Sequence, residues 1–432
     1  MKKNIRNLLI LVIVFAALLT VFLILDSNND PAATGVLYKI EDDGIKKIEI
    51  NNEFGSYAFE KTGEEWMISS GEDTYRTNPE KMNLLISSLQ SVPIDRVLDE
   101  KIAEYGFEQP RATVKVTDTK GNTYSFLVGA ETASRANAYV YDLKTKKSMV
   151  TSTAAVSQLT GSLQAYRAKD VLTIDSTKIR RLAFYENEKL YMSVTNTDYK
   201  NWALEYPFEA PARKVILTEF VAKMRGWEVA GYPEQTQTKA DMGLENPKTA
   251  MQITDANGNQ QTIFFGKDDG TTTYVQIGEN EIVKLYTVDV NLSTMTPEQV
   301  MYVAPLESNI GELKSISVTK DTPYVFTIDH SGSVPVITEN GKDVSYQDFS
   351  GILTKYITLN ATGYDPKQID TSGKPVAVCT SVLADGGTKE LKLYPRDADT
   401  LYMLVDGKTE FYLNIADLDE LLYRIEKASN SL

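Results

Sequence analysis

Apolar and polar residues alternate in many short stretches between residues 37 and 432. This period-two pattern predicts strands that bury one face. The three clearest strands recur at equal intervals along the chain. Their apolar positions are Ile45, Ile48 and Ile50, then Ile179, Leu182 and Phe184, and finally Leu313, Ile316 and Val318.

Helical periodicity interrupts the strands once or twice in each interval. Apolar residues spaced i, i+3, i+4 and i+7 predict helices with one buried stripe. Asn78 and Pro79 supply an N-cap and a first helical residue for one of them. A closing helix is expected at the end of each interval, most clearly over residues 415–428 after Asn414. The stripes are Met82, Leu85, Ile86 and Leu89; Phe220, Met224 and Trp227; Phe349, Ile352, Leu353 and Tyr356; and Leu418, Leu421, Leu422 and Ile425.

One segment occurs twice in the sequence, and a weaker copy occurs a third time. Residues 107–122 return as 244–259, and a fainter copy begins at residue 373. In each copy a Gly lies eleven residues after a Pro, as in Pro110 to Gly121, Pro247 to Gly258 and Pro375 to Gly386. Asp, Asn and Gly at this position predict a hairpin turn.

These patterns predict an α+β fold made of three tandem repeats of a mainly antiparallel sheet with packed helices. The predicted repeat domains are residues 37–174, 175–307 and a divergent 308–432. Each is too long for a solenoid repeat, so each should have a core of its own.

The first 36 residues have a different character. Residues 8–25 carry no charge and follow Lys2, Lys3 and Arg6. A helix of that length spans about 27 Å, close to the thickness of a bilayer's hydrocarbon core. A cleaved signal peptide is the competing interpretation, but its apolar region is usually shorter and ends at a small-residue cleavage site. We therefore expect a transmembrane anchor followed by a tether, with the N-terminus cytoplasmic and the bulk of the chain extracytoplasmic.

Charge and cysteine content exclude some classes of function. The formal net charge of −14 disfavours nucleic acid as a partner. Cys379 is the only cysteine, which excludes an intrachain disulfide and a cysteine-rich metal site. Its strand-like surroundings predict a buried, inert thiol.

Candidate catalytic patterns are isolated. His330 is the only histidine, and its surroundings predict a surface turn. Ser317 and Lys320 match the S-x-x-K motif of penicillin-recognising enzymes, and residues 61–63 match K-T-G, but the order is reversed and Ser317 is predicted to lie in a strand. Asp255 opens a segment resembling part of a calcium loop, for which a hairpin turn is the better interpretation.

Binding patterns are equally general. The 59 acidic residues single out no carboxylate pair for glycoside chemistry. Tyrosine dominates the aromatic residues, which allows a carbohydrate or protein face, although packing within strands is the simpler interpretation. Tyrosines of predicted strands include Tyr139, Tyr141, Tyr274 and Tyr402. We predict no catalytic, cofactor-binding or metal-binding residues.

Several of these motifs resemble a bacterial family of domains of unknown function. They are the Trp66-Met67-Ile68 strand, the Tyr-Gly-Phe-Glu-x-Pro turn at 105–110, the Met-Gly-Leu-Glu-x-Pro turn at 242–247 and the Gly-Asn hairpins. The resemblance covers residues 37–305, and the third repeat departs from it by lacking the Trp and the Gly-Phe/Leu-Glu step. Members of this family are often encoded beside ABC-2-type transporters related to the gliding-motility system.

The resemblance implies a non-enzymatic, membrane-anchored extracytoplasmic accessory or scaffold protein. Its expected partners are an ABC-2 permease and ATPase, with the membrane contacted through the N-terminal helix. The alternative hypothesis is a cell-envelope glycan or peptidoglycan binding module that uses tyrosine-lined sheet faces. A hydrolase with carboxylate chemistry is a third.

Overall fold

The computed structural model describes residues 35–430, except 42–43, 99–102, 197, 199–200, 235, 279–280, 293–294 and 368. The predicted anchor, residues 8–25, lies outside the described residues. Within the described part, every helix is too short or too polar to cross a bilayer. The chain forms two compact units, and the division falls between Lys169 and Asp170.

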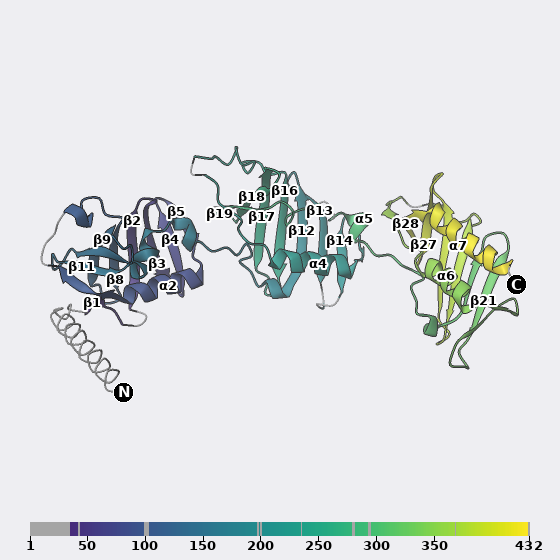
Figure 1. Ribbon diagram of the computed structural model, residues 1–432. Helices are drawn as coiled ribbons and strands as arrows, with labels where there is room; N and C mark the ends of the chain where they lie inside the picture. The colour runs from purple at the N-terminus through teal and green to yellow at the C-terminus, as the bar shows by residue number, and fades with distance from the viewer. Residues whose placement is uncertain are drawn as a thin grey trace, which may run out of the picture. The chain divides into compact units, whose positions relative to one another are not determined.

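The first unit is built on a nine-stranded sheet, called here the first sheet, in the order β5-β4-β3-β2-β8-β9-β10-β11-β7 (Figure 1). Helix α2 (Pro79–Gln90) packs on one face of this sheet. A separate two-stranded ribbon pairs β1 (Gly35–Lys39) with β6 (Ser91–Ile94). The other elements are β2 (Ile45–Asn52), β3 (Gly55–Thr62), β4 (Glu65–Ser70), β5 (Asp73–Arg76), β7 (Arg96–Leu98), η1 (Ala103–Tyr105), β8 (Ala112–Asp118), β9 (Thr123–Glu131), β10 (Asn137–Asp142), β11 (Ser148–Ser152), α3 (Thr153–Val156), η2 (Ser157–Thr160) and η3 (Leu163–Tyr166).

The second unit contains two sheets. The second sheet has eight strands in the order β15-β14-β13-β12-β16-β17-β18-β19. Helix α4 (Lys214–Arg225) packs on it. Its elements are η4 (Ser176–Lys178), β12 (Ile179–Glu186), β13 (Lys189–Asn196), β14 (Trp202–Tyr206), β15 (Ala210–Pro211), β16 (Thr249–Asp255), β17 (Gln260–Asp268), β18 (Thr272–Ile277), β19 (Glu281–Tyr286) and α5 (Pro297–Val300).

The third sheet has nine strands in the order β23-β22-β21-β20-β25-β26-β27-β28-β24, and two helices pack on it. Its elements are η5 (Ile310–Glu312), β20 (Leu313–Thr319), β21 (Pro323–Asp329), β22 (Val336–Glu339), β23 (Lys342–Val344), α6 (Tyr346–Ile357), β24 (Gly363–Tyr364), β25 (Ala377–Leu383), β26 (Thr388–Pro395), β27 (Thr400–Val405), β28 (Lys408–Asn414) and α7 (Ile415–Ser429).

All three sheets follow one plan. A central antiparallel pair, β2–β8, β12–β16 or β20–β25, is flanked by hairpins on both sides. The prediction of repeated, mainly antiparallel sheets is confirmed at this level. The described chain is nevertheless largely β, because the closing helices α3 and α5 are single turns and only α7 is long.

The predicted helical stripes form the cores. In α6, Phe349, Ile352, Leu353 and Tyr356 are all buried, as the spacing predicts. Burying each such side chain stabilises the fold by about 1.5–3 kcal/mol. Asn78 caps α2 by accepting a hydrogen bond from the backbone N–H of Lys81 at 3.1 Å.

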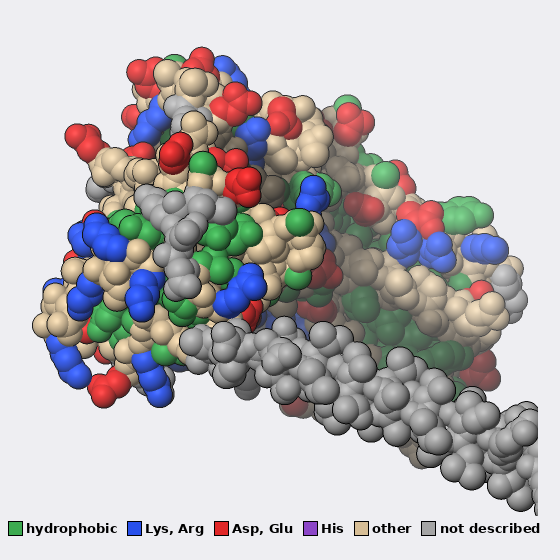
Figure 2. Space-filling view, turned by 60° about the vertical axis from the view of Figure 1, so that its left-hand side comes forward, with side chains coloured by type: hydrophobic (Ala, Val, Ile, Leu, Met, Phe, Trp, Pro, Cys, Tyr) green, Lys and Arg blue, Asp and Glu red, His purple; other side chains and the backbone are tan. Residues whose placement is uncertain are grey.

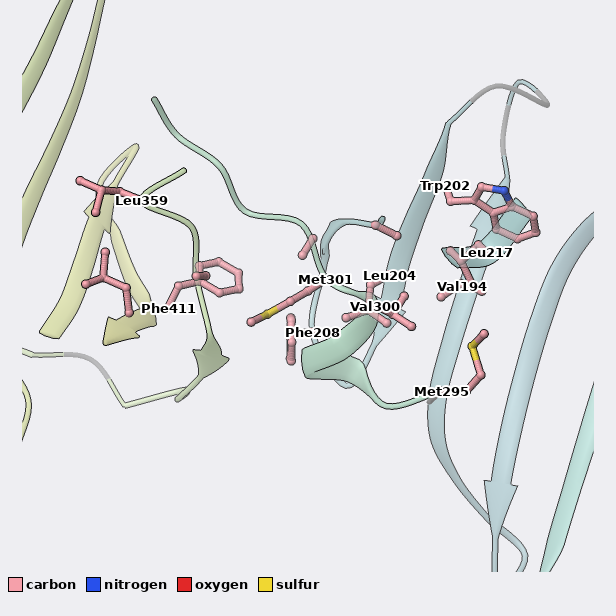
Figure 3. Close-up of a cluster of buried hydrophobic side chains, with 14 of the residues drawn as sticks. Val194, Trp202, Leu204, Phe208, Leu217, Met295, Val300, Met301, Leu359 and Phe411 are labelled. Atoms are coloured by element: carbon pink, nitrogen blue, oxygen red, sulfur yellow. The ribbon is translucent and has the colours of Figure 1, made fainter. Parts of the chain in front are cut away.

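The second and third sheets share one continuous apolar core, shown in part in Figure 3. Phe208, after β14, stacks on Tyr364 of β24 with ring centroids 3.8 Å apart, and it meets Phe411 of β28 edge to face at 5.8 Å. Met301 and Leu359 are fully buried beside these rings. Residues 175–307 and 308–432 are therefore joined by apolar packing as well as by the chain.

Charged side chains are unevenly spread over the surface. On the face shown in Figure 2, Lys and Arg gather on the lower part, and Asp and Glu gather on the upper part.

Candidate functional site

The repeated Gly-Phe/Leu-Glu-x-Pro segments cross the face of the sheet that the helices leave open. In the first sheet, Tyr105 stacks on Tyr139 at 4.3 Å, and Phe107 lies 5.4 Å from Tyr141. Gly106 between them has φ +73°, and a Cβ on Gly129 would lie 2.0 Å from the carbonyl oxygen of Tyr105. Glycine is therefore required where the crossing segment meets the strand.

The second sheet has the same arrangement with other side chains. Met242 and Leu244 pack with Tyr274 in a small apolar cluster. Gly243 has φ +70°, and a Cβ on Gly266 would lie 2.2 Å from the carbonyl oxygen of Met242. The repeated glycines thus build the framework of both sheets.

The repeated Asp residues also serve the framework. Asp118 accepts hydrogen bonds from the backbone N–H groups of Lys120 and Asn122, and from the Asn122 side chain. Asp255 accepts the matching bonds from Asn257 and Asn259. These bonds, above all the one from the Asn side chain, lower the pKa of both carboxyls. The predicted hairpin turn at Asp255 is confirmed.

The isolated catalytic patterns lie in separate elements of the fold. His330 is exposed after β21, and its Nε2 lies 2.9 Å from the carbonyl oxygen of Leu313. Ser317 lies inside β20 in the second unit, whereas Lys61 lies in β3 of the first. In the described part of the chain, His, Cys, Asp and Glu side chains nowhere gather in groups of three or more that could hold a metal ion.

Cys379 is fully buried in β25, as predicted. Burial raises the pKa of its thiol to about 12. A thiol with so little thiolate is a poor nucleophile, which fits a packing role.

A pocket of about 780 Å³ lies at one end of the second sheet. Described residues between β19 and α5, with the start of α5, form one side of it, and the ends of β12, β13, β16, β17 and β18 form the other. Three exposed carboxylates line it, those of Glu186, Asp268 and Glu298. Phe265, Val290 and Met295 provide buried apolar surface.

Tyr191 connects the strands to the segment above the pocket. Its hydroxyl donates to the carbonyl oxygen of Met295 at 3.3 Å. Burial, and then the negative charge of Glu186, raise the pKa of this hydroxyl. The side chains of Glu186 and Tyr191 therefore interact within the pocket.

At the equivalent end of the first sheet, side-chain hydrogen bonds hold residues 159–161 against the strands. Asn52 pairs with Ala112 there, as Glu186 pairs with Thr249 in the second sheet, so Asn52 and Glu186 occupy the same position. The Asn52 amide donates to the carbonyl oxygens of Leu159 at 3.1 Å and Gly161 at 2.8 Å.

Tyr57 adds a third bond to the first sheet's closure. Its hydroxyl donates to the carbonyl oxygen of Gly161 at 2.7 Å. The side-chain amide of Asn52 in turn donates to the Tyr57 hydroxyl at 3.1 Å. A carboxylate has no hydrogen to donate, so Glu186 cannot make the bonds that Asn52 makes.

Glu186 and Glu298 were not among the residues that the sequence singled out. An alignment of the repeats through the strand residues Ile50 and Phe184 would have placed Glu186 opposite Asn52. The position of the described residues between β19 and α5 has no comparable signal in the sequence.

Comparison with known proteins gives a family match. The family described as "Domain of unknown function (DUF4340)" matches residues 95–247 and, a second time, residues 202–370. Together the two matches cover more than half of the chain. No curated protein matches it.

Proposed function

Because this chain belongs to the DUF4340 family of domains of unknown function, we propose a function from its architecture: a non-enzymatic accessory or scaffold protein of an ABC-2-type transporter. The protein is held by a single N-terminal membrane anchor, with its sheets on the extracytoplasmic side. An ABC-2 permease and a separate ATPase are its partners.

The repetition of one strand order in three successive sheets carries this proposal. The residues that the repeats share serve the framework: Asp118 and Asp255 hold turns, and Gly129 and Gly266 accommodate the crossing segments. Repeated frameworks that present broad faces suit a scaffold, whereas catalysis needs one cleft with converging groups.

The membrane location rests on the sequence of the first 36 residues. The uncharged run 8–25 has the length of a bilayer span, and Lys2, Lys3 and Arg6 precede it. A cysteine label tests the orientation. In intact cells, a membrane-impermeant maleimide should label a Lys374→Cys variant, because Lys374 is exposed. Wild-type protein is the matched control, since its only cysteine is buried. Labelling that requires cell lysis would contradict the extracytoplasmic location.

Co-purification tests the partnership. The full chain, solubilised in a mild detergent, should bring down an ABC-2 permease and its ATPase in comparable amounts. A matched variant with residues 8–25 replaced by an unrelated membrane span separates contact through the sheets from contact through the anchor. A chain that migrates alone from gently solubilised membranes would overturn the proposal. Retention on purified cell wall would instead favour the glycan-binding alternative.

A further inference from the structure

The pocket at the end of the second sheet combines acidic and apolar lining. We propose that it binds a cationic group carried on an apolar stem, as in a lysine or arginine side chain of a peptide. This inference concerns the second sheet alone, and it holds whether or not the chain joins a transporter.

The volume of the pocket suits such a ligand. About 780 Å³ lies within the range of pockets that hold small molecules or single peptide side chains with their neighbours. At the equivalent end of the first sheet, the pocket beside Asn52 and Arg111 is smaller, about 330 Å³.

The negative charge of the residues that line the pocket favours a positively charged ligand. Glu186, Asp268 and Glu298 come from three different segments, β12, β17 and α5, and they are exposed to solvent. The described residues that line the pocket include no Lys, Arg or His. A cation entering the pocket meets acceptors from several directions, whereas an anion meets only like charge.

The apolar walls of the pocket accommodate the methylene stem of a lysine or arginine side chain. Phe265, Val290 and Met295 are at most 8% exposed, and Leu292 is half-buried beside them. Lysine and arginine side chains carry methylene groups that pack on such surfaces while the charged end stays in contact with polar groups. A bare metal ion would leave this apolar surface unused.

Calorimetric titration of the purified full chain tests the proposal. The probe is the neutral-ended tripeptide acetyl-Ala-Lys-Ala-amide, and its control replaces lysine by norleucine, which keeps the stem and removes the charge. The lysine peptide should bind roughly tenfold or more tightly than the norleucine peptide, and added salt should weaken its binding.

Two matched variants locate the site. Glu186→Gln, Asp268→Asn and Glu298→Gln together should weaken binding of the lysine peptide roughly tenfold. The control variant removes three exposed carboxylates from the first unit, by Glu64→Gln, Glu65→Gln and Glu72→Gln, and should bind as the wild type does. Thermal melts confirm that both variants fold.

Three results would overturn the inference. The first is no heat of binding with the lysine peptide. The second is equal affinity for the lysine and norleucine peptides. The third is an equal loss of affinity in both triple variants, because that would assign the binding to the net charge of the chain. None of these results bears on the transporter partnership, which co-purification tests separately.

Discussion

The first and second sheets share a strand order but differ in two places. At one sheet end, the first sheet has Asn52, whose amide ties residues 159–161 to the strands, whereas the second has Glu186 and a larger pocket. The second sheet also shares its core with the third sheet, through Phe208. The core of the first sheet is built from its own residues. A common framework thus tolerates local changes that alter what each copy can bind and join.

The substitution with the largest expected effect tests the apolar core that the second and third sheets share. Phe208→Ala removes the ring that stacks on Tyr364 and meets Phe411, so we expect the second unit to lose about 3–5 kcal/mol of unfolding free energy. Calorimetric unfolding of the full chain should show a lower transition for the second unit and an unchanged one for the first. Phe54→Ala, at a residue 54% exposed, is the control and should change little. An equal shift of both transitions would contradict the assignment of Phe208 to the second unit alone.

Exchanging the residues at the sheet ends is the next test. Asn52→Glu removes three donated hydrogen bonds and places a carboxylate beside carbonyl oxygens, so it should cost about 1–3 kcal/mol. Glu186→Asn loses no hydrogen bond that holds the strands and should change stability by less than about 0.5 kcal/mol. Hydrogen exchange over residues 157–161 should become faster in Asn52→Glu. Equal effects of the two substitutions would show that the two ends are built alike.

Substitutions of Tyr57 and Tyr191 test the same difference between the ends of the first and second sheets. Tyr57→Phe removes a 2.7 Å bond to Gly161 and should cost about 1 kcal/mol. Tyr191→Phe removes a bond of 3.3 Å at the open pocket, so its cost should be smaller. Urea unfolding of each unit measures both costs. A larger loss from Tyr191→Phe would mean that Met295 is held more firmly than the first sheet's closing segment.

The other ends of the first and second sheets, at Asp118 and Asp255, should respond alike to substitution. Hydrogen bonds depress the pKa of Asp118 and Asp255 in the folded chain, so these carboxylates stabilise the fold above the ordinary Asp pKa of about 3.9. That stability is lost as the pH falls through the lowered values. Asp118→Asn and Asp255→Asn should each destabilise their own unit at neutral pH, and the difference from wild type should shrink as the pH falls below about 4. Urea midpoints measured across this range check it, and a response in only one sheet would break the equivalence.

Local pattern was enough to predict the parts of the fold that depend on neighbouring residues. The buried stripe of α6 and the turn at Asp255 follow from spacing and turn chemistry within a few residues. The closing helices were predicted as full helices, but α3 and α5 end after one turn. Their apolar periodicity is too short to extend them.

The pocket could not be predicted from the periodicity of apolar residues. In the first sheet, closure depends on the donors Asn52 and Tyr57, which bond carbonyl oxygens more than a hundred residues away in the chain. Glu186, at the position of Asn52, has no hydrogen to donate. The edge strands β7 and β24 also went unpredicted, because each is only two or three residues long and is defined by its partner.

The ribbon of β1 and β6 has a mechanical consequence. Any pull on the N-terminus reaches β1 before it reaches the central strand β2, so the hydrogen bonds between β1 and β6 take up the strain first. Because Tyr38 of β1 packs on Tyr124 and Phe126 of the first sheet, peeling β1 away would also uncover part of that sheet's core.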